Sequence, residues 1–331
     1  MNKTLIEIKN LRKTYPVYGP LGKLFPPVDA MKAVSNVSLE IREGETYGLV
    51  GESGCGKTTT GRSVLGLVKP DSGEILYQGH DLTKLNDKQF RPLRKDLQMV
   101  FQDTLSSLNP RQRIGALLEE PLIIQGIGDS ESRRRMVLEM LQMVGLSEEH
   151  YFRYPHELSG GQVQRLGIAR AMIIKPKLIV CDEPVSALDV SIQAQILNMM
   201  TALQKETGVS LLFISHDIGV VRYISNRIGV MYLGTLVEEA ETEELFANTL
   251  HPYTKALFAS VPDLKQKERK VSLSGELPVN NNAFTGCVFH TRCPHATDLC
   301  RREAPQLQEA SLGHKVACHF PACAKGREQD G

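Results

Sequence analysis

Long apolar runs are missing from this sequence of 331 residues, and so is an excess of either charge. No stretch reaches the ~18 consecutive apolar residues that a membrane-spanning helix needs, and the opening MNKTLIEIKN lacks the apolar run of a secretory signal. Lys and Arg number 39 against 38 Asp and Glu, so the net charge of +1 offers no bulk attraction to nucleic acid. We therefore expect a cytosolic chain that meets a membrane only through a partner.

Cysteine is scarce over most of the chain. Cys55 and Cys181 stand alone, whereas the other five of the seven crowd the last fifth of the sequence. A small secreted protein would use such a cluster for disulfides, but in a cytosolic chain metal binding is the better expectation. The composition, 41% apolar and 23% charged, is that of an ordinary globular protein, and the length suggests two or three domains.

The pattern of apolar residues predicts an α/β fold. Short β-branched runs predict strands at 5–17, 33–51, 74–79, 97–102, 177–184 and 210–217, and three- and four-residue apolar steps predict helices at 57–67, 131–145 and 191–208. Such alternation is typical of a largely parallel sheet with helices on both faces. A helical insert at roughly 103–176 divides this core. Beyond a charged linker at 263–270, the cysteine-bearing tail is predicted to be a separate small module.

The segment GESGCGKT, Gly51 to Thr58, fits G-x-x-x-x-G-K-[ST] between a predicted strand and a predicted helix. Its glycines let backbone N–H groups converge on a phosphate, Lys57 reaches the β and γ oxygens, and Thr58 can ligate Mg²⁺. We read this as a nucleotide site. The alternative is a glycine-rich turn with a solvated lysine. The flanking strand and helix argue against it, because the phosphate-binding motif requires both.

A second acidic motif, LIVCDE, ends a predicted buried strand in two carboxylates, Asp182 and Glu183. At the carboxyl end of a parallel strand, Asp182 is placed to hold Mg²⁺ and Glu183 to polarise an attacking water. The alternative is an acidic cap at a helix start.

Four further residues are weak signals when taken singly. Gln102 and His216 each follow a predicted strand, where an amide or a neutral imidazole could reach Mg²⁺, water or a γ-phosphate. Asp189, in SALD, could be a helix N-cap only, and Tyr15 could stack on a base or simply pack.

The loop HELSGGQVQR, residues 156–165, places glycines before a predicted helix but contains no lysine at the phosphate-binding spacing. A helix N-terminus of this kind can complete an anion site without building one.

Taken in chain order, Tyr15, GESGCGKT, Gln102, LSGGQ, LIVCDE, SALD and His216 resemble the nucleotide-binding subunit of an ABC transporter over residues 1 to about 250. The resemblance implies a P-loop NTPase core with an antiparallel β subdomain and a helical subdomain at about 103–176. It implies ATP-binding residues Tyr15, Gly51, Glu52, Ser53, Gly54, Cys55, Gly56, Lys57, Thr58 and Thr59. It implies Glu183, His216 and Gln102 as catalytic residues, Ser186 and Asp189 in the D-loop, and Mg²⁺ held through Thr58, Gln102 and Asp182.

The same resemblance implies a head-to-tail dimer with two ATPs between the subunits. The signature residues Leu158, Ser159, Gly160, Gly161 and Gln162 would then serve the ATP of the opposite chain. Closure would be a population shift driven by ATP contacts that exist only in the closed dimer.

The tail narrows the resemblance to one group of importers. HPYTKALFASVP, LSGELP and GCVFHTRCPHATDLC are similar to the C-terminal extension of oligopeptide and dipeptide importer ATPases, a group that includes nickel and metal-chelate importers. This implies an ABC domain at 1–255 and an extension at 256–331. It also implies a second, non-identical ATPase, two permease subunits, an extracytoplasmic solute-binding protein and a position at the cytoplasmic face of the membrane. The solute is expected to be a peptide, with nickel or a metal-chelate as the alternative.

The cysteine spacing Cys287-x5-Cys293-x6-Cys300-x17-Cys318 supplies four thiolates, enough for one [4Fe–4S] cluster or one Zn²⁺. Cys323 could replace Cys318 as the fourth ligand. Similarity to the importer tails favours the cluster, while the nearby histidines keep zinc open: His290, His295, His314 and His319. A tail without metal is the third possibility.

A soluble ABC ATPase of translation or DNA repair is the competing class. Members that act in translation carry two cassettes in one chain, but this sequence has one phosphate loop. Members that act in DNA repair have a long coiled coil between the phosphate loop and the signature, and the interval from Lys57 to Leu158 is too short for it. A regulatory subunit would be expected to have lost Lys57, Glu183 or His216, and all three are present.

Overall fold

The computed structural model describes residues 3–19, 26–259 and 285–321. The chain divides into two compact units. The first comprises Met1–Thr4, Ile41–Thr46 and Lys84–Ser215, and the second comprises Leu5–Glu40, Tyr47–Thr83 and His216–Gly331.

The first unit contains a parallel sheet of three strands in the order β6-β7-β8. These are β6 (Leu97–Val100), β7 (Leu178–Asp182) and β8 (Ser210–Ser215). Every residue of β7 and β8 is buried, as expected for strands covered on both faces.

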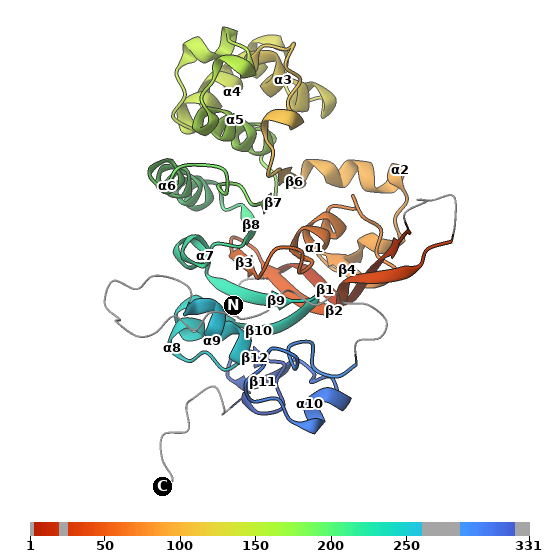
Figure 1. Cartoon of the computed structure of the whole chain (residues 1–331). Coiled ribbons are helices and arrows are strands. Elements are labelled where there is room, and N and C mark those ends of the chain that lie inside the picture. The colour runs from red at the N-terminus through yellow and green to blue at the C-terminus, as the bar shows by residue number, and fades with distance from the viewer. Residues whose placement is uncertain (1–2, 20–25, 260–284, 322–331) are drawn as a thin grey trace. The chain divides into compact units, whose positions relative to one another are not determined.

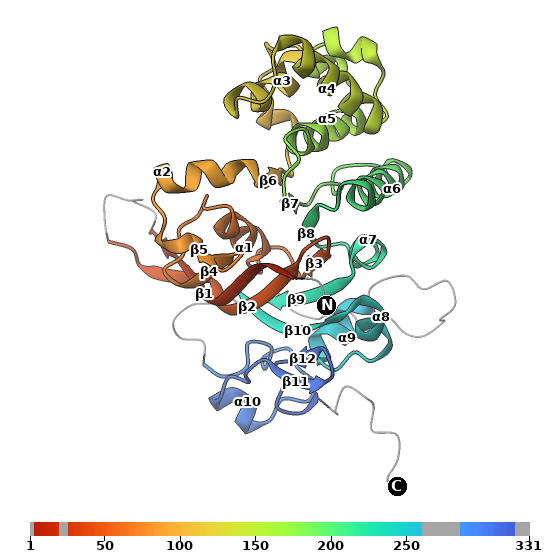
Figure 2. The ribbon, with the colours of Figure 1, turned by 180° about the vertical axis from the view of Figure 1, so that it is seen from behind.

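The helices of the first unit are α2 (Asp87–Phe90), α3 (Ile114–Ile124), α4 (Ser130–Met143), α5 (Gly160–Met172) and α6 (Val190–Thr207). Helices α3, α4 and α5 pack together, as both views show (Figures 1 and 2). Helix α4 begins where Asp129 accepts a hydrogen bond from the Ser132 N–H at 2.8 Å, and it ends before Gly145, whose φ is +72°. The predicted helical insert is therefore present. Short 3₁₀ turns at Leu105–Ser107, Glu148–Phe152 and Pro155–Glu157 connect its parts, and a further 3₁₀ turn at Arg91–Lys95 follows α2.

The second unit contains one mixed and one antiparallel sheet. The mixed sheet has the order β3-β9-β10-β12-β11, formed by β3 (Thr46–Val50), β9 (Arg227–Tyr232), β10 (Thr235–Glu241), β12 (His314–Val316) and β11 (Gln308–Ser311). Strands β3 and β9 run parallel, and the other pairs are antiparallel. The antiparallel sheet has the order β2-β1-β4-β5, formed by β2 (Asp29–Arg42), β1 (Thr4–Val17), β4 (Ser72–Tyr77) and β5 (His80–Asp81).

The described helices of this unit are α1 (Lys57–Val64), α7 (Ile218–Ile224), α8 (Thr242–Ala247), α9 (Pro252–Phe258) and α10 (Asp298–Arg302). A 3₁₀ turn at Leu82–Lys84 follows β5. Among the described helices, none combines the length and the hydropathy that crossing a bilayer requires.

The described part of the tail pairs with the mixed sheet, which its composition does not predict. Strand β12 pairs with β10, with Glu238 opposite Val316, and the Ala317 N–H donates to the Val237 carbonyl at 2.8 Å. The hairpin β11–β12 therefore extends the mixed sheet at its edge (Figure 2). Composition misses this because both strands are short and one of them is exposed along its whole length. The linker predicted at 263–270 and Cys323 lie outside the described residues.

A buried charge network lies within the mixed sheet. Glu239 is almost fully buried, and its carboxylate accepts hydrogen bonds from Arg227 at 2.7 Å, Tyr47 Oη at 2.9 Å and Lys315 at 3.2 Å. Buried carboxylates need such partners because desolvation of an isolated charge is costly. Lys315 lies on β12, so this network also attaches the tail to the sheet.

Candidate nucleotide-binding site

The loop Gly51–Thr58 joins β3 to α1 as the motif requires. Gly56 occupies the N-cap position of α1 with a φ of +104°, and a Cβ there would come within 2.1 Å of the Ala33 carbonyl oxygen. A Cβ on Gly51 would meet the Met231 carbonyl oxygen at the same distance. Both positions therefore require glycine because neighbouring backbone carbonyls pack against them, in addition to any requirement for space around a ligand.

The ammonium of Lys57 lies within the curve of this loop. Its Nζ donates to the carbonyl oxygens of Gly51 at 2.7 Å and Glu52 at 3.0 Å, and the side chain is nearly buried. Ser53 and Gly54 are exposed, whereas Cys55 is buried and burial raises the pKa of its thiol. Thr58 and Thr59 follow on the first turn of α1. The loop thus presents an exposed tip beside one fixed cation.

Glu52 of this loop is held by residues that sequence reasoning missed. Its backbone N–H donates to Tyr253 Oη at 3.1 Å, and its carboxylate accepts from Arg292. Tyr253 lies on α9 and Arg292 lies in the tail, more than 200 residues along the chain. No spacing signal in the sequence links them to the loop.

In the first unit, Gln102 and Glu183 come together. Gln102 Nε2 donates to Glu183 Oε2 at 3.2 Å, although 81 residues separate them. Glu183 follows β7 directly and has a φ of +48°, which a non-glycine side chain seldom adopts. Its backbone N–H donates to the Ile214 carbonyl at 2.9 Å, which fixes this conformation. Asp182, the last residue of β7, is buried.

The SALD segment lies between Glu183 and α6. The Ser186 hydroxyl donates to the Glu183 carbonyl oxygen at 3.1 Å. Asp189 occupies the N-cap position of α6, but its side chain makes no capping hydrogen bond. The Asp189 side chain therefore does not cap α6, which was the alternative interpretation of this residue.

The glycine loop of residues 156–165 leads into α5. Ser159 is the N-cap, and it forms a capping box with Gln162: the Ser159 N–H donates to Gln162 Oε1 at 3.0 Å, and the Gln162 N–H donates to Ser159 Oγ at 3.4 Å. Ser159 and Gly160 are exposed, while Leu158 is half-buried. The N-terminus of a helix of 13 residues therefore faces solvent with small side chains around it.

Tyr15 and His216 lie in the second unit. Tyr15 is half-buried on β1, with Lys13 Nζ 5.6 Å from the ring centroid. His216 is exposed and follows β8, one residue before Asp217, which caps α7. Their predicted contacts with a base and with a γ-phosphate stay predictions.

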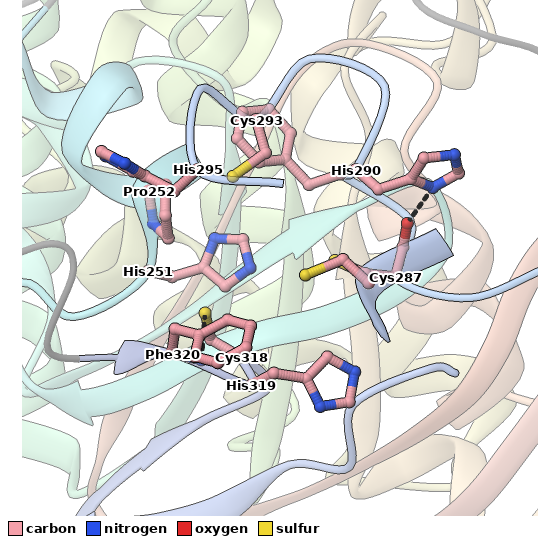
Figure 3. Close-up of a pocket in the computed structure, with 11 residues that line it drawn as sticks. His251, Pro252, Cys287, His290, Cys293, His295, Cys318, His319 and Phe320 are labelled. Carbon is pink, nitrogen blue, oxygen red and sulfur yellow. Dashed lines mark hydrogen bonds between the residues drawn. The ribbon is translucent and has the colours of Figure 1, made fainter. Parts of the chain in front are cut away.

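Four cysteines of the tail line one pocket of about 20 Å³, together with histidines and aromatic residues: Cys287, Cys293, Cys300, Cys318, His251, Pro252, Phe289, His290, His295, His319 and Phe320. Figure 3 shows Cys287, Cys293 and Cys318 approaching the ring of His251 from separate segments. Burial raises the pKa of Cys287 and of Cys318 to about 11 and lowers that of His251 to about 4. Within the described ranges, no three His, Cys, Asp or Glu side chains are grouped tightly enough to hold a single metal ion.

Two known families match the sequence. The first, described as ABC transporter, matches residues 34–186, and the second, described as oligopeptide/dipeptide transporter, C-terminal region, matches residues 237–300. Over 323 residues the chain is 48% identical to the oligopeptide transport ATP-binding protein AppF of Bacillus subtilis, which covers 96% of this chain and 98% of that protein. The chain belongs to the ABC transporter ATP-binding family.

Other members of this family match over similar lengths. The oligopeptide transport ATP-binding protein OppF of Salmonella typhimurium is 48% identical, covering 96% of each chain. The dipeptide transport ATP-binding protein DppF of Haemophilus influenzae is 46% identical, covering 96% of this chain and 97% of that one. The resemblance drawn from the motifs is thereby confirmed.

Solved structures of ABC cassettes share the fold. The dimeric cassette MJ0796 has a TM-score of 0.64 and 33% identity, and the match covers 72% of this chain and 99% of that one. A second structure of MJ0796, a dimeric post-hydrolysis state bound to ADP and Pi, matches with the same values. The predicted P-loop NTPase fold with a helical subdomain and an antiparallel sheet is therefore confirmed.

Proposed function

We propose that this chain is the ATP-hydrolysing subunit of an importer of dipeptides and oligopeptides. The observation that carries the proposal is near-complete coverage, at 46–48% identity, by relatives named for oligopeptide and dipeptide transport. These names favour peptides over the nickel or metal-chelate alternative, which no feature of the described residues supports. The ABC domain is proposed to span 1–255, with its helical part at about 103–176, and the extension 256–331.

In the proposed mechanism the loop Gly51–Thr58 binds the phosphates through backbone N–H groups, and Lys57 contacts the β and γ oxygens. The exposed tip at Ser53 and Gly54 leaves room for a ligand, and the closeness of Gly51 and Gly56 to neighbouring carbonyls keeps the loop curved. We also assign Thr59, the next residue on α1, to ATP binding, and we assign Tyr15 to stacking on the base.

Hydrolysis needs a base for the attacking water, and we assign this to Glu183. The water attacks the γ-phosphorus, its proton passes to a Glu183 carboxylate oxygen, and ADP leaves. Gln102 donates to the same carboxylate at 3.2 Å, which orients it, and His216 is assigned to the γ-phosphate. The Thr58 hydroxyl, the Asp182 carboxylate and the Gln102 amide oxygen are hard oxygen donors that fit Mg²⁺, which would neutralise phosphate charge when bound.

The signature residues are proposed to complete an ATP site held by another ATPase. The exposed N-terminus of α5 has the positive end of the helix dipole and no lysine, so it suits a γ-phosphate that other residues already hold. Ser186 and Asp189 are assigned to the same interface. We propose that the other ATPase is non-identical, and that two permeases and a solute-binding protein complete an assembly at the cytoplasmic face of the membrane.

For the cysteine pocket we propose a [4Fe–4S] cluster. Four thiols line one cavity, yet no three potential ligands in the described part of the chain meet tightly enough for one ion. Four thiolates can ligate one [4Fe–4S] cluster, and the similarity of the tail to the importer extensions favours the cluster over zinc. The raised pKa of Cys287 and Cys318 means that binding must displace protons from both thiols.

The cluster is tested by purifying the chain anaerobically and measuring iron, sulfide and zinc. We expect about four irons per chain with broad visible absorption, and the loss of both in C287S and C300S, whereas C181S, a buried cysteine on β7, keeps them. One zinc per chain, or no metal, would contradict the proposal.

The transport function is tested in proteoliposomes that contain the chain, its permeases and a partner ATPase. We expect peptide and binding protein to stimulate ATP hydrolysis and peptide uptake. The variant Glu183→Gln should still bind ATP, but its rate of hydrolysis should fall by about 10²–10⁴-fold. Glu206→Gln, an exposed control at the end of α6, should hydrolyse ATP like wild type. Uptake of nickel in place of peptide, or activity only with a ribosomal or DNA partner, would overturn the assignment.

A further inference from the structure

The described part of the tail contacts Glu52 of the phosphate loop. Arg292 NH1 lies 3.0 Å from Glu52 Oε2 and 3.2 Å from Oε1, and it also donates to Tyr232 Oη at 3.3 Å. The Arg292 side chain is 8% exposed and that of Glu52 is 19% exposed. This is therefore a largely desolvated pair rather than a surface ion pair, and removal of one partner leaves an uncompensated charge.

The orientation of Arg292 depends on Glu52. Its Nε is buried and has no acceptor among the described residues, whereas its NH1 donates to Glu52 and to Tyr232. The guanidinium also lies over the Tyr232 ring, 5.8 Å from its centroid.

Arg292 belongs to the same turn as the cysteine pocket. Its N–H donates to the Phe289 carbonyl at 3.0 Å, and the next residue, Cys293, lines the pocket. Phe289 is 1% exposed and packs against Tyr232 and Tyr253, with ring centroids 5.3 and 5.5 Å apart. The turn is thus fixed on the aromatic residues that support Glu52.

Each polar part of Glu52 is in use. Its N–H donates to Tyr253, its carbonyl accepts from Lys57, and its carboxylate accepts from Arg292. A displacement of Glu52 would therefore move the carbonyl that holds the Lys57 ammonium. The Glu52 carboxylate would also repel a bound polyphosphate if no cation faced it.

We propose that Arg292 is a positioning residue for the phosphate loop, through which the C-terminal extension sets the affinity of this chain for ATP. Arg292 holds Glu52 in place and cancels its charge beside the nucleotide. The inference rests on the proposed function, because it needs ATP to bind the loop Gly51–Thr58.

The test compares ATP affinity in the full-length chain by titration with a fluorescent ATP analogue. R292Q should weaken binding by about tenfold, within the range usual for coupling between sites. R292K should recover part of the loss because it keeps the charge. R302Q should bind ATP like wild type, because Arg302 is an exposed residue of the same extension whose Nε donates to the Asp298 carbonyl at 3.4 Å.

A double variant separates positioning from simple unfolding. E52Q/R292Q removes both charges, so it should bind ATP more tightly than R292Q, and urea titrations of both variants measure whether the stability of the fold has changed as well as the ATP affinity. In the assembled complex R292Q should raise KM with kcat retained. Unchanged affinity in folded R292Q, or no recovery in the double variant, would overturn the inference. Absence of ATP binding by the wild-type chain would instead overturn the proposed function.

Discussion

Gly160 and Gly161 are neighbours in the signature loop, but their surroundings differ. A Cβ on Gly160 would have Leu188 Cδ2 as its nearest neighbour at 3.7 Å, an ordinary contact. A Cβ on Gly161 would lie 2.7 Å from Ile192 Cγ2 on α6. Gly161 is therefore required by packing between two helices, whatever it does for a ligand, whereas packing does not explain Gly160.

This difference makes Gly160→Ala the clean test of the signature loop. We expect unchanged or slightly raised stability, because alanine favours helices over glycine by about 1 kcal/mol, and unchanged ATP binding by the isolated chain. Hydrolysis by the assembled complex should fall by about tenfold or more, since the Cβ hinders approach of the backbone to a phosphate. ATP-binding titrations and steady-state rates provide the measurement.

Gly161→Ala is the matched comparison. It should lose about 1–3 kcal/mol of stability through overpacking against Ile192. If Gly160→Ala abolished ATP binding by the isolated chain, the loop would belong to the site of Lys57 itself, and its assignment to the other ATPase would be wrong.

At the scale of elements, strand β12 is attached to β10 through a buried histidine. His314 is fully buried, with Nε2 2.9 Å from Glu238 Oε1 and Nδ1 3.4 Å from Glu244 Oε1. Glu238 also accepts from the backbone N–H groups of Leu250 and His251. Burial by itself lowers the pKa of His314, but the hydrogen bonds and charges of Glu238 and then Glu244 outweigh it and raise the pKa above the ordinary value.

A raised pKa in the folded state gives this joint a pH dependence. The stabilisation from protonated His314 is complete below its unfolded pKa of about 6.5 and is lost as the pH rises through the higher folded value. We expect His314→Gln to lower the free energy of unfolding by about 3 kcal/mol at pH 6 and by less at pH 9, because a buried charge pair is broken. Urea titrations across this pH range, followed by circular dichroism, measure the difference.

His80→Gln is the control, because His80 is exposed on β5 of the same unit. A loss in His314→Gln that did not change with pH would show that packing, and not protonation, holds β12 to the sheet.

At the scale of the whole molecule, apolar periodicity predicts an element wherever the apolar pattern repeats within a short stretch of the chain, and it predicted neither β9 nor β10. The helical insert between Gln102 and β7, and the two buried strands that end before Glu183 and His216, were predicted from such patterns. The pairing of the tail with the mixed sheet was not predicted, because it involves the buried residues Glu238 and Glu239 of β10, a segment for which the sequence predicted no strand. Charged residues that are buried by distant partners have no periodic signal.

The sequence by itself determined the motifs: the phosphate loop, the Asp182–Glu183 pair and the signature are each contiguous, and the four thiols lie within residues 287–318. Only the tertiary structure brought Gln102 to Glu183, gave Glu183 its positive φ, and brought Arg292 to Glu52. The residues of a local motif are neighbours in the sequence, so their order alone is enough to identify the motif. Contacts such as Arg292 with Glu52, 240 residues apart, depend on how the whole chain packs, because only burial makes such a pair strong.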